Sequence, residues 1–294
     1  MLSGLTTSDF YRRLRVPLML SGALGVIALL FMGGLVLGVM QSFGMEPLAG
    51  TYTLTLTHYV NVFTDPRFVD ALLLTLKVSI ATTVLTSVLA VISALVLRQS
   101  LWGKKLVTFI FQLNIPIPHV MGGIAAIFLL SRAGLLARLV YNLGWVQDPA
   151  AFPALVYDRN MISVILVYVW KGVSFTGIIL LATLQSVGED YEDLARTLGA
   201  SRWQRVRFVV LPLIMPGLLR GAILVFAAVF SSYAIPFLVG ASYPKALAVL
   251  AFEYYTNVDL GFRKEAMAMS TVMAILAAVL VWVYMRLAAY VRGE

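Results

Sequence analysis

The sequence predicts an all-α, polytopic membrane protein with six transmembrane helices. Of its 294 residues, 61% are hydrophobic and 12% are charged, whereas a soluble globular domain contains about 45–50% apolar and about 25% charged residues. The chain also contains six apolar runs, each about 20 residues or longer. A helix of that length rises about 1.5 Å per residue and crosses a hydrocarbon layer of roughly 30 Å. Composition and run length therefore lead to the same fold class.

The first of these runs, residues 16–40, follows a basic tail, residues 1–15, and so begins like a secretory signal peptide. Its 25 uncharged residues are too many for a cleaved signal core of about 7–15 residues, and we expect a retained membrane helix. The other predicted spans are 71–97, 106–130, 161–187, 213–239 and 266–285. The expected organisation is an N-terminal tail followed by one transmembrane domain, residues 16–294.

The charges of the loops predict which side of the membrane each loop faces. Twelve of the 22 lysines and arginines lie in the tail, in residues 98–105, in residues 188–212 and after the sixth span. The intervening loops carry 7 basic and 8 acidic residues. Because basic loops stay in the cytoplasm, both termini and the loop 188–212 are predicted to be cytoplasmic. The net charge of +8 is thus explained by topology, and no nucleic-acid partner is expected.

The residue types that would carry catalysis or bind a metal are scarce. The chain has no cysteine and only two histidines, His58 and His119, which excludes thiol chemistry and a histidine metal cluster. It also lacks a GxxxxGK[ST] phosphate loop. We therefore expect a non-catalytic protein that holds no cofactor or metal. A secondary transporter or an intramembrane enzyme is disfavoured, because the predicted spans show no ionisable relay, repeated halves or paired catalytic acids.

The loop 188–212 is predicted to form two short amphipathic helices joined by a turn. Gly199 stands where a helix ends in a left-handed residue, and Ser201 with Gln204 predicts a capping box for the second helix. Pro212 is expected to close that helix before the fifth span. The first helix carries an apolar stripe at positions i, i+3, i+4 and i+7: Tyr191, Leu194, Ala195 and Leu198. Such a stripe is typical of a helix that enters a groove on another protein, although a surface connector held by anionic membrane lipid would also explain the arginines.

This loop also carries a family signature. Residues 193–195 (DLA), Gly199 four residues later and residues 209–212 (VVLP) closely resemble the EAA loop, which marks permease subunits of binding-protein-dependent ABC importers. The chain departs from that pattern by having Asp-Leu for Glu-Ala and Val209 for Ile. Further segments similar to that family are 114–123, 167–187 and 231–240. Among its subfamilies the layout resembles spermidine/putrescine-type permeases most closely.

The resemblance implies a type I ABC importer permease fold in the inner (cytoplasmic) membrane, together with a set of partners. In that family the EAA loop forms a coupling helix that docks on a cytoplasmic ATPase dimer, which itself holds ATP and Mg²⁺. A second permease chain, identical or homologous, completes the path, and an extracytoplasmic binding protein delivers the solute. The coupling residues implied here are Tyr191, Asp193, Leu194, Ala195, Leu198, Gly199, Ser201 and Pro212. A polyamine or related small molecule is the expected solute, with an amino-acid-like compound, iron chelate, phosphonate or oxyanion left open.

Two predicted spans are interrupted by proline at membrane depth, the third by Pro116 and Pro118 and the fifth by Pro236. Proline frees backbone carbonyls that lipid cannot satisfy, so such breaks face protein or a water-filled cavity. The candidate path is therefore built from these prolines with nearby polar residues and a lysine inside the fourth span: Asn114, His119, Lys171, Ser231, Ser232 and Tyr233. The alternative is that the breaks only shape the helix bundle. No aspartate or glutamate lies within a predicted span, which disfavours an intramembrane polyamine site.

Overall fold

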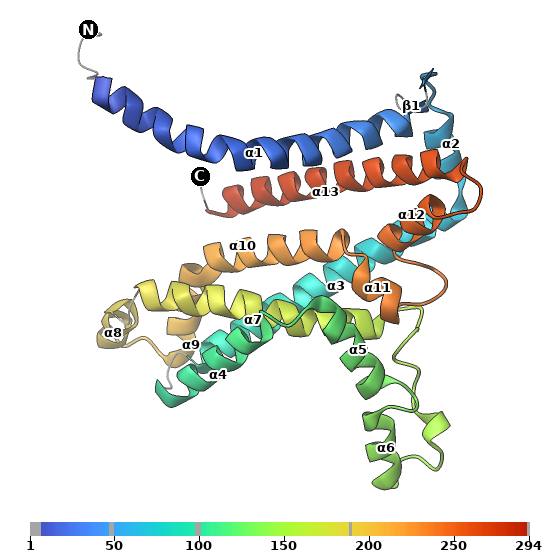
Figure 1. The fold of residues 1–294 in the computed structure, drawn as a ribbon. Coiled ribbons are helices and arrows are strands. Elements are labelled where there is room, and N and C mark those ends of the chain that lie inside the picture. The colour runs from blue at the N-terminus through green and yellow to red at the C-terminus, as the bar shows by residue number, and fades with distance from the viewer. Residues whose placement is uncertain (1–6, 47–49, 98–100, 188–189, 293–294) are drawn as a thin grey trace. The chain divides into compact units, whose positions relative to one another are not determined.

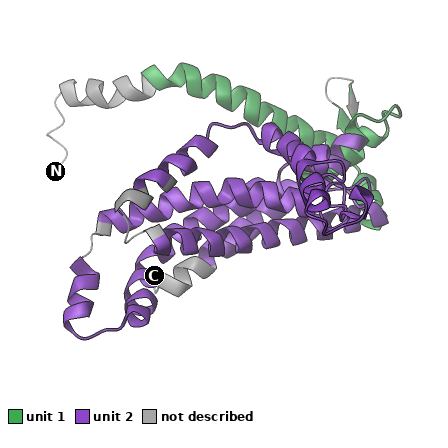
Figure 2. Cartoon of the chain, turned by 90° about the horizontal axis from the view of Figure 1, so that it is seen from below, with its two compact units in different colours: residues 1–64, 254–271 green, residues 65–253, 272–294 purple. Residues whose placement is uncertain are grey.

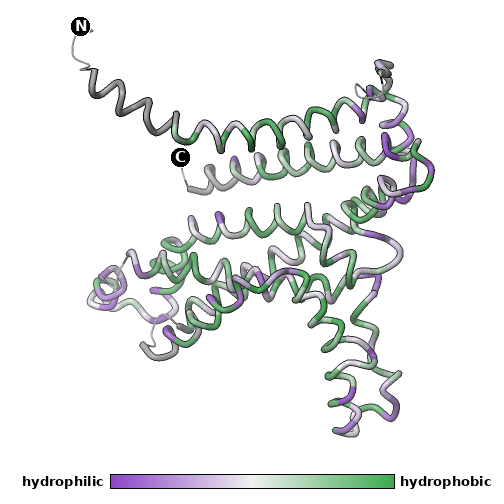
Figure 3. The backbone as a smooth tube through the Cα atoms, viewed as in Figure 1, coloured by the Kyte–Doolittle hydropathy of each residue, from purple (hydrophilic) through white to green (hydrophobic). Residues whose placement is uncertain are grey.

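The computed structural model describes residues 7–46, 50–97, 101–187 and 190–292, most of which are helical (Figure 1). Six helical segments of this part of the chain are long and apolar enough to cross a membrane: Met19–Ser42, Pro66–Val96, His119–Asn142, Ile162–Ser186, Arg202–Phe230 and Phe262–Arg286. Hydrophobic residues extend along these helices, while hydrophilic residues concentrate in the connections between them (Figure 3). The predicted six-helix membrane fold is confirmed.

The chain divides into two compact units (Figure 2). The smaller unit contains residues 1–64 and 254–271. It comprises helix α1 (Thr7–Ser42), a two-stranded antiparallel hairpin of β1 (Met45–Glu46) and β2 (Thr51–Tyr52), helix α2 (Thr57–Thr64) and the beginning of α13 (Phe262–Arg292). Polar contacts join these parts: Asn61 donates to Glu265 at 2.8 Å, and Lys264 pairs with Glu46 at 3.6 Å.

The larger unit contains residues 65–253 and 272–294. Its core is formed by α3 (Pro66–Leu97), α7 (Ile162–Val187) and α10 (Leu211–Phe230), which pack along one another (Figure 1). Glycines allow the close approach: a Cβ added to Gly172 would lie 2.8 Å from the Thr86 methyl group, and one added to Gly221 would lie 2.7 Å from that of Thr176. Inside a membrane the hydrophobic effect does not drive helices together, so close van der Waals packing at small residues stabilises their contact instead.

The predicted third span, 106–130, is not one helix. The structure has α4 (Leu101–Asn114), a break at 115–118, and then α5 (His119–Leu130) and α6 (Leu135–Asn142). The third segment long enough to span the membrane is consequently His119–Asn142. Proline lacks the amide hydrogen that a helix needs, and it disfavours the helical conformation of the residue before it. Two prolines within three positions therefore end α4 rather than bend it.

The predicted fifth span, 213–239, differs at both ends. At its start, α9 (Arg202–Arg205) continues through a π-helical segment, η3 (Val206–Val210), directly into α10. Pro212 therefore does not close the second helix of the loop, contrary to the prediction. It lies in the first turn of α10, after the wide π turn in which the Leu211 amide donates to the Val206 carbonyl. A proline at the start of a helical segment loses no hydrogen bond, and widened turns of this kind accommodate prolines and kinks.

At its other end, the fifth span breaks at residues 231–233 before a short helix, α11 (Ala234–Val239). The remaining elements are α8 (Asp190–Thr197), a 3₁₀ turn, η2 (Pro149–Ala151), and α12 (Leu247–Tyr255). Asp158 caps α7, since its carboxylate accepts from the amides of Asn160 and Ile162 at 2.9 and 2.7 Å. The Leu247 amide donates to the Thr75 hydroxyl at 2.8 Å, which ties the start of α12 to α3.

Candidate functional site

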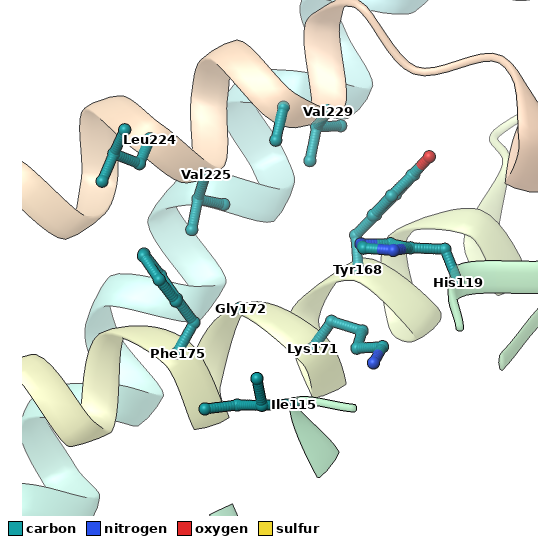
Figure 4. A pocket seen from close by; sticks show the side chains of 10 residues that line it. Ile115, His119, Tyr168, Lys171, Gly172, Phe175, Leu224, Val225 and Val229 are labelled. Atoms are coloured by element: carbon teal, nitrogen blue, oxygen red, sulfur yellow. The ribbon is translucent and has the colours of Figure 1, made fainter. Parts of the chain in front are cut away.

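A cavity of about 390 Å³ lies between α7, α10 and the break that separates α4 from α5 (Figure 4). We call it the groove. Its lining comes from residues 115 and 119 at the break, one face of α7 and one face of α10: Ile115, His119, Tyr168, Lys171, Gly172, Phe175, Leu224, Val225, Ala228 and Val229. The wall is mostly apolar, and its large polar side chains are those of His119, Tyr168 and Lys171. No carboxylate belongs to the lining that the structure describes.

The ammonium group of Lys171 donates hydrogen bonds to the backbone of the break. Its Nζ donates to the carbonyl oxygen of Asn114 at 2.7 Å and to the carbonyl oxygen of Ile117. In an uninterrupted helix the Asn114 carbonyl would accept from the amide of residue 118, but Pro118 has no amide hydrogen. The lysine therefore supplies the hydrogen bond that the proline removes.

Asn114 lies behind the groove rather than in its wall. Its side chain is only 4% exposed, and its Nδ2 donates to the Trp170 carbonyl at 3.0 Å and to the Ser174 hydroxyl at 2.7 Å. These bonds fix the last residue of α4 to α7. The structure therefore places this predicted path residue in a contact between helices.

Tyr168 connects α7 to the break in the fifth span. Its hydroxyl donates to Ser232, which lies between α10 and α11, and its ring centroid is 6.4 Å from that of His119. Because Tyr168 and Lys171 are one helical turn apart, a single face of α7 contacts both the break at 115–118 and the break at 231–233.

The other predicted path residues lie around the groove without lining it. Ser231 donates its hydroxyl to the Ala227 carbonyl at 2.8 Å, a bond to the last turn of α10. Tyr233 stacks on Phe237 at 5.0 Å, and Pro236 is buried beside Tyr168. Pro116 and Pro118 form the break itself. Of the nine predicted path residues, the structure brings His119 and Lys171 into the groove wall.

Residues that the sequence reasoning missed supply the rest of the groove wall. Tyr168 and Phe175 stand at i−3 and i+4 from Lys171, so they share its face of α7. Leu224 and Ala228 are likewise four residues apart on α10. Helical spacing from Lys171 would have found the first pair, whereas the α10 face is uniformly apolar and gives no polar signal.

The turn after α8 has the backbone geometry that the sequence predicts. Gly199 has φ +83°, the left-handed region that favours glycine. The Gly199 amide donates to the Arg196 carbonyl and the Ala200 amide to the Ala195 carbonyl, both at 3.0 Å. This pair of bonds is a Schellman motif, which satisfies the last carbonyls of a helix.

The capping box at the start of α9 is also confirmed. The Ser201 hydroxyl accepts from the Gln204 amide at 3.3 Å, and the Gln204 side chain accepts from the Ser201 amide at 2.8 Å. These reciprocal bonds begin a new helix directly after the Schellman turn. The change of direction between α8 and α9 is therefore fixed by local hydrogen bonds.

The apolar stripe of α8 faces outward. Tyr191, Leu194 and Leu198 are 58%, 61% and 81% exposed, and Ala195 is half-buried beside them. Asp193 is also exposed and pairs with Arg196 at 3.5 Å. Such a patch on a short helix is suited to contact with another protein.

An ion pair that the sequence reasoning missed holds α8 against the following segment. Glu192 pairs with Arg205 at 3.9 Å, and the two side chains are 22% and 13% exposed. The pair joins α8 to the end of α9, which continues into α10. The pair therefore connects α8 to a segment that continues into a helix lining the groove.

Most of the chain matches one known protein family. Residues 86–292 match the family described as "Binding-protein-dependent transport system inner membrane component". That range includes α8, the capped turn and every residue of the groove wall.

The chain is also similar to individual permeases. It is 30% identical over 229 residues to the molybdenum transport system permease protein ModB of Mycobacterium tuberculosis, covering 75% of this chain and 80% of that protein. It is 29% identical over 208 residues to the molybdate/tungstate transport system permease protein WtpB of Pyrococcus abyssi, covering 68% and 72%. A probable sulfate transport system permease protein of Marchantia polymorpha is 25% identical over 199 residues, 66% of each chain.

A solved structure has the same fold. A bacterial ABC transporter involved in the import of the acidic polysaccharide alginate matches with a TM-score of 0.77 at 18% identity, covering 96% of this chain and 98% of that one. Together with the six apolar helices, the family match indicates a multi-pass protein of the inner membrane. The chain belongs to the family of binding-protein-dependent transport system inner membrane components and is a permease subunit of an ABC importer.

Proposed function

We propose that this permease subunit couples ATP hydrolysis by a separate cytoplasmic ATPase dimer to the passage of a small oxyanion past the groove. The observation that carries the coupling part is the outward-facing apolar stripe of α8, held by the Gly199 turn and the Ser201 capping box. ATP and Mg²⁺ bind to the partner ATPase in this proposal, and the permease itself holds no cofactor. The coupling residues are those of α8 and its turn, as the family resemblance implies.

The proposed assembly contains two further partners. A second permease chain, either a copy of this one or a homologue, completes the path along the groove. An extracytoplasmic binding protein delivers the solute. Supporting this partner, the related alginate transporter has been solved in complex with its solute-bound periplasmic protein. Both termini and α8 face the cytoplasm, because the loops on that side carry most of the basic residues.

Two observations favour an oxyanion over a polyamine. The relatives named above transport molybdenum, molybdate or tungstate, or sulfate. In addition, the groove wall that the structure describes contains Lys171 and His119 but no carboxylate, so its potential favours an anion over a polycation. The spermidine/putrescine layout that the sequence resembles has no support from either observation.

Reconstitution tests the proposal. The permease, its ATPase and the matching binding protein are placed in vesicles, and uptake of radiolabelled sulfate, molybdate and putrescine is measured with and without ATP. We expect ATP-dependent uptake of an oxyanion and none of putrescine. Putrescine uptake would refute the substrate class, and uptake that is independent of ATP or of the ATPase subunit would refute coupling.

A further inference from the structure

We infer that Lys171 is a positioning residue that replaces the missing amide hydrogen of Pro118 and so fixes the width of the groove. It does this by holding the α4–α5 break against α7. The inference deepens the proposed function and rests on it only for the consequence for transport, because the contacts themselves need no solute. It assigns the lysine to the protein backbone instead of to the solute.

The break between α4 and α5 leaves two backbone carbonyls without their usual helical donors. A helix that ran through residue 118 would satisfy the Asn114 carbonyl through the amide of that residue. Pro118 has none, and the Ile117 carbonyl is also left over because the Met121 amide donates to Pro118 at 3.0 Å. Lys171 donates to both of these carbonyls. One ammonium group thus satisfies the two acceptors that the break leaves inside an apolar wall.

Hydrogen bonds also make the contact between the break and α7 rigid. Asn114, at the end of α4, donates to the Trp170 carbonyl and the Ser174 hydroxyl on α7. Lys171 lies between these two positions in the sequence and bonds in the opposite direction, from α7 to the break. Hydrogen bonds that run both ways across one contact hold the break in a single position relative to α7. Ile115, whose side chain lines the groove, is carried by this segment.

These bonds leave Lys171 little capacity to bind the solute. An ammonium group has three hydrogens, and two of those of Lys171 are directed at carbonyl oxygens. A solute that bound Lys171 strongly would have to compete with bonds that keep two partly buried acceptors satisfied, and leaving such acceptors unpaired costs free energy. Lys171 therefore acts on passage through the shape of the groove.

A suppressor experiment in the assembled permease–ATPase complex tests this inference. Ile115→Cys serves as a reporter, because the chain contains no cysteine. Its rate of reaction with a maleimide is measured alongside the unfolding temperature of the complex. We expect Lys171→Met to change the labelling rate several-fold and to lower the unfolding temperature. Lys171→Gln, which keeps a hydrogen-bond donor, should fall between Lys171→Met and the unaltered lysine.

The decisive comparison adds a proline substitution to Lys171→Met. Pro118→Ala restores an amide hydrogen for the Asn114 carbonyl and should bring labelling and unfolding temperature back toward the starting values. Pro116→Ala is the matched control: the acceptor that its amide would meet in a helix, the Gln112 carbonyl, already accepts from the Ile115 amide at 3.3 Å. We expect it to restore neither property.

Restoration by both proline substitutions, or by neither, would overturn the inference, as would a labelling rate that Lys171→Met leaves unchanged. If the Lys171→Met complex does not assemble, the same comparison is made with Lys171→Gln. Uptake of sulfate and molybdate is measured separately. A higher KM with unchanged labelling would assign Lys171 to the solute instead, and absence of uptake by the unaltered complex would count against the proposed function alone.

Discussion

At the scale of single residues, Gly199 shows how one backbone conformation sets the direction of a helix. Its φ of +83° cannot be reached by most side chains without strain, and a Cβ at this position would meet no other atom within 4 Å. The requirement for glycine is therefore purely conformational. Its consequence is the Schellman turn that sets the direction of α8 relative to α9.

Replacing this glycine should uncouple the complex without unfolding it. A β-branched side chain in the left-handed region costs about 1–2 kcal/mol, so Gly199→Val should turn α8 away while leaving the spans intact. We expect the variant to retain the ATPase but to lose solute-stimulated ATP hydrolysis. Gly199→Asn is the control, because asparagine tolerates this conformation and should keep most of the stimulation. Equal stimulation in both variants would argue against a role for the turn.

His58 provides a prediction on pH. Burial of the imidazole, and secondarily the charge of Lys264, lower the pKa of His58 below its usual value of 6.5. Well above pH 6.5 the side chain is neutral in both the folded and the unfolded state. Below that pH the unfolded state binds the proton more readily, so stability should fall. Thermal unfolding at pH 7.5 and 5.5 measures this loss, and it should be smaller in His58→Gln.

The roles of individual polar residues were the least predictable part of the sequence. A lysine inside a span is a functional hypothesis by default, but only the structure shows that Lys171 bonds to the Asn114 carbonyl. Those two residues are 57 positions apart. No local pattern reveals which distant backbone group a side chain will satisfy.

At the scale of elements, the sequence predicts best where the signals are local. Capping residues and apolar spacing within 25 residues define α8, the turn and α9, and the structure confirms the Gly199 and Ser201 features. The breaks at Pro116 and Pro118 were foreseen, but the division into separate helices was not. Whether a proline bends or ends a helix depends on which neighbours can satisfy the freed carbonyls, and those neighbours lie far away in the sequence.

The apolar stripe of α8 should not tolerate a charged side chain that docking on the ATPase would bury. Ala195 lies half-buried between the exposed Leu194 and Leu198. In Ala195→Asp, docking would bury an unpaired carboxylate, which costs a few kcal/mol. We expect the variant to reach the membrane and to lose the ATPase during purification. Thr197→Asp on the same helix is the control and should keep the ATPase, because residue 197 does not belong to the stripe.

Helix packing in the larger unit gives a prediction about stability. A Cβ at position 172 would lie 2.8 Å from the Thr86 methyl group, so Gly172→Ala should push α3 from α7 and destabilise the protein by about 1–3 kcal/mol. Thr86→Ala removes both the methyl group and the hydroxyl, each of which would lie 2.8 Å from the added Cβ, and should restore part of the loss. Gly22→Ala, where an added Cβ meets nothing within 4 Å, should not lower the unfolding temperature, because alanine favours the helix more than glycine does. A similar effect of both glycine substitutions would contradict the packing account.

At the scale of the whole molecule, composition and the length of apolar runs were enough to predict six membrane-crossing helices, because the bilayer leaves few alternatives. They did not predict the groove, which lies between α7, α10 and the break that separates α4 from α5. The central claim is that α8 is the segment through which the ATPase acts on this permease. The exposed stripe, the Gly199 turn and the Glu192–Arg205 pair all lie in one continuous segment that runs from α8 through α9 into α10.

Cross-linking from position 198 tests that claim most directly. Leu198 is 81% exposed at the end of the stripe, and Leu198→Cys introduces the only thiol of the chain. In inner-membrane vesicles that contain the whole transporter, a short bifunctional reagent should join this position to the ATPase subunit, and the yield should change when ATP is added. Leu143→Cys, in a loop predicted to be extracytoplasmic, should give no such product. Cross-linking of position 198 to the binding protein would contradict the account. So would reaction of position 198 only with thiol reagents confined to the lipid.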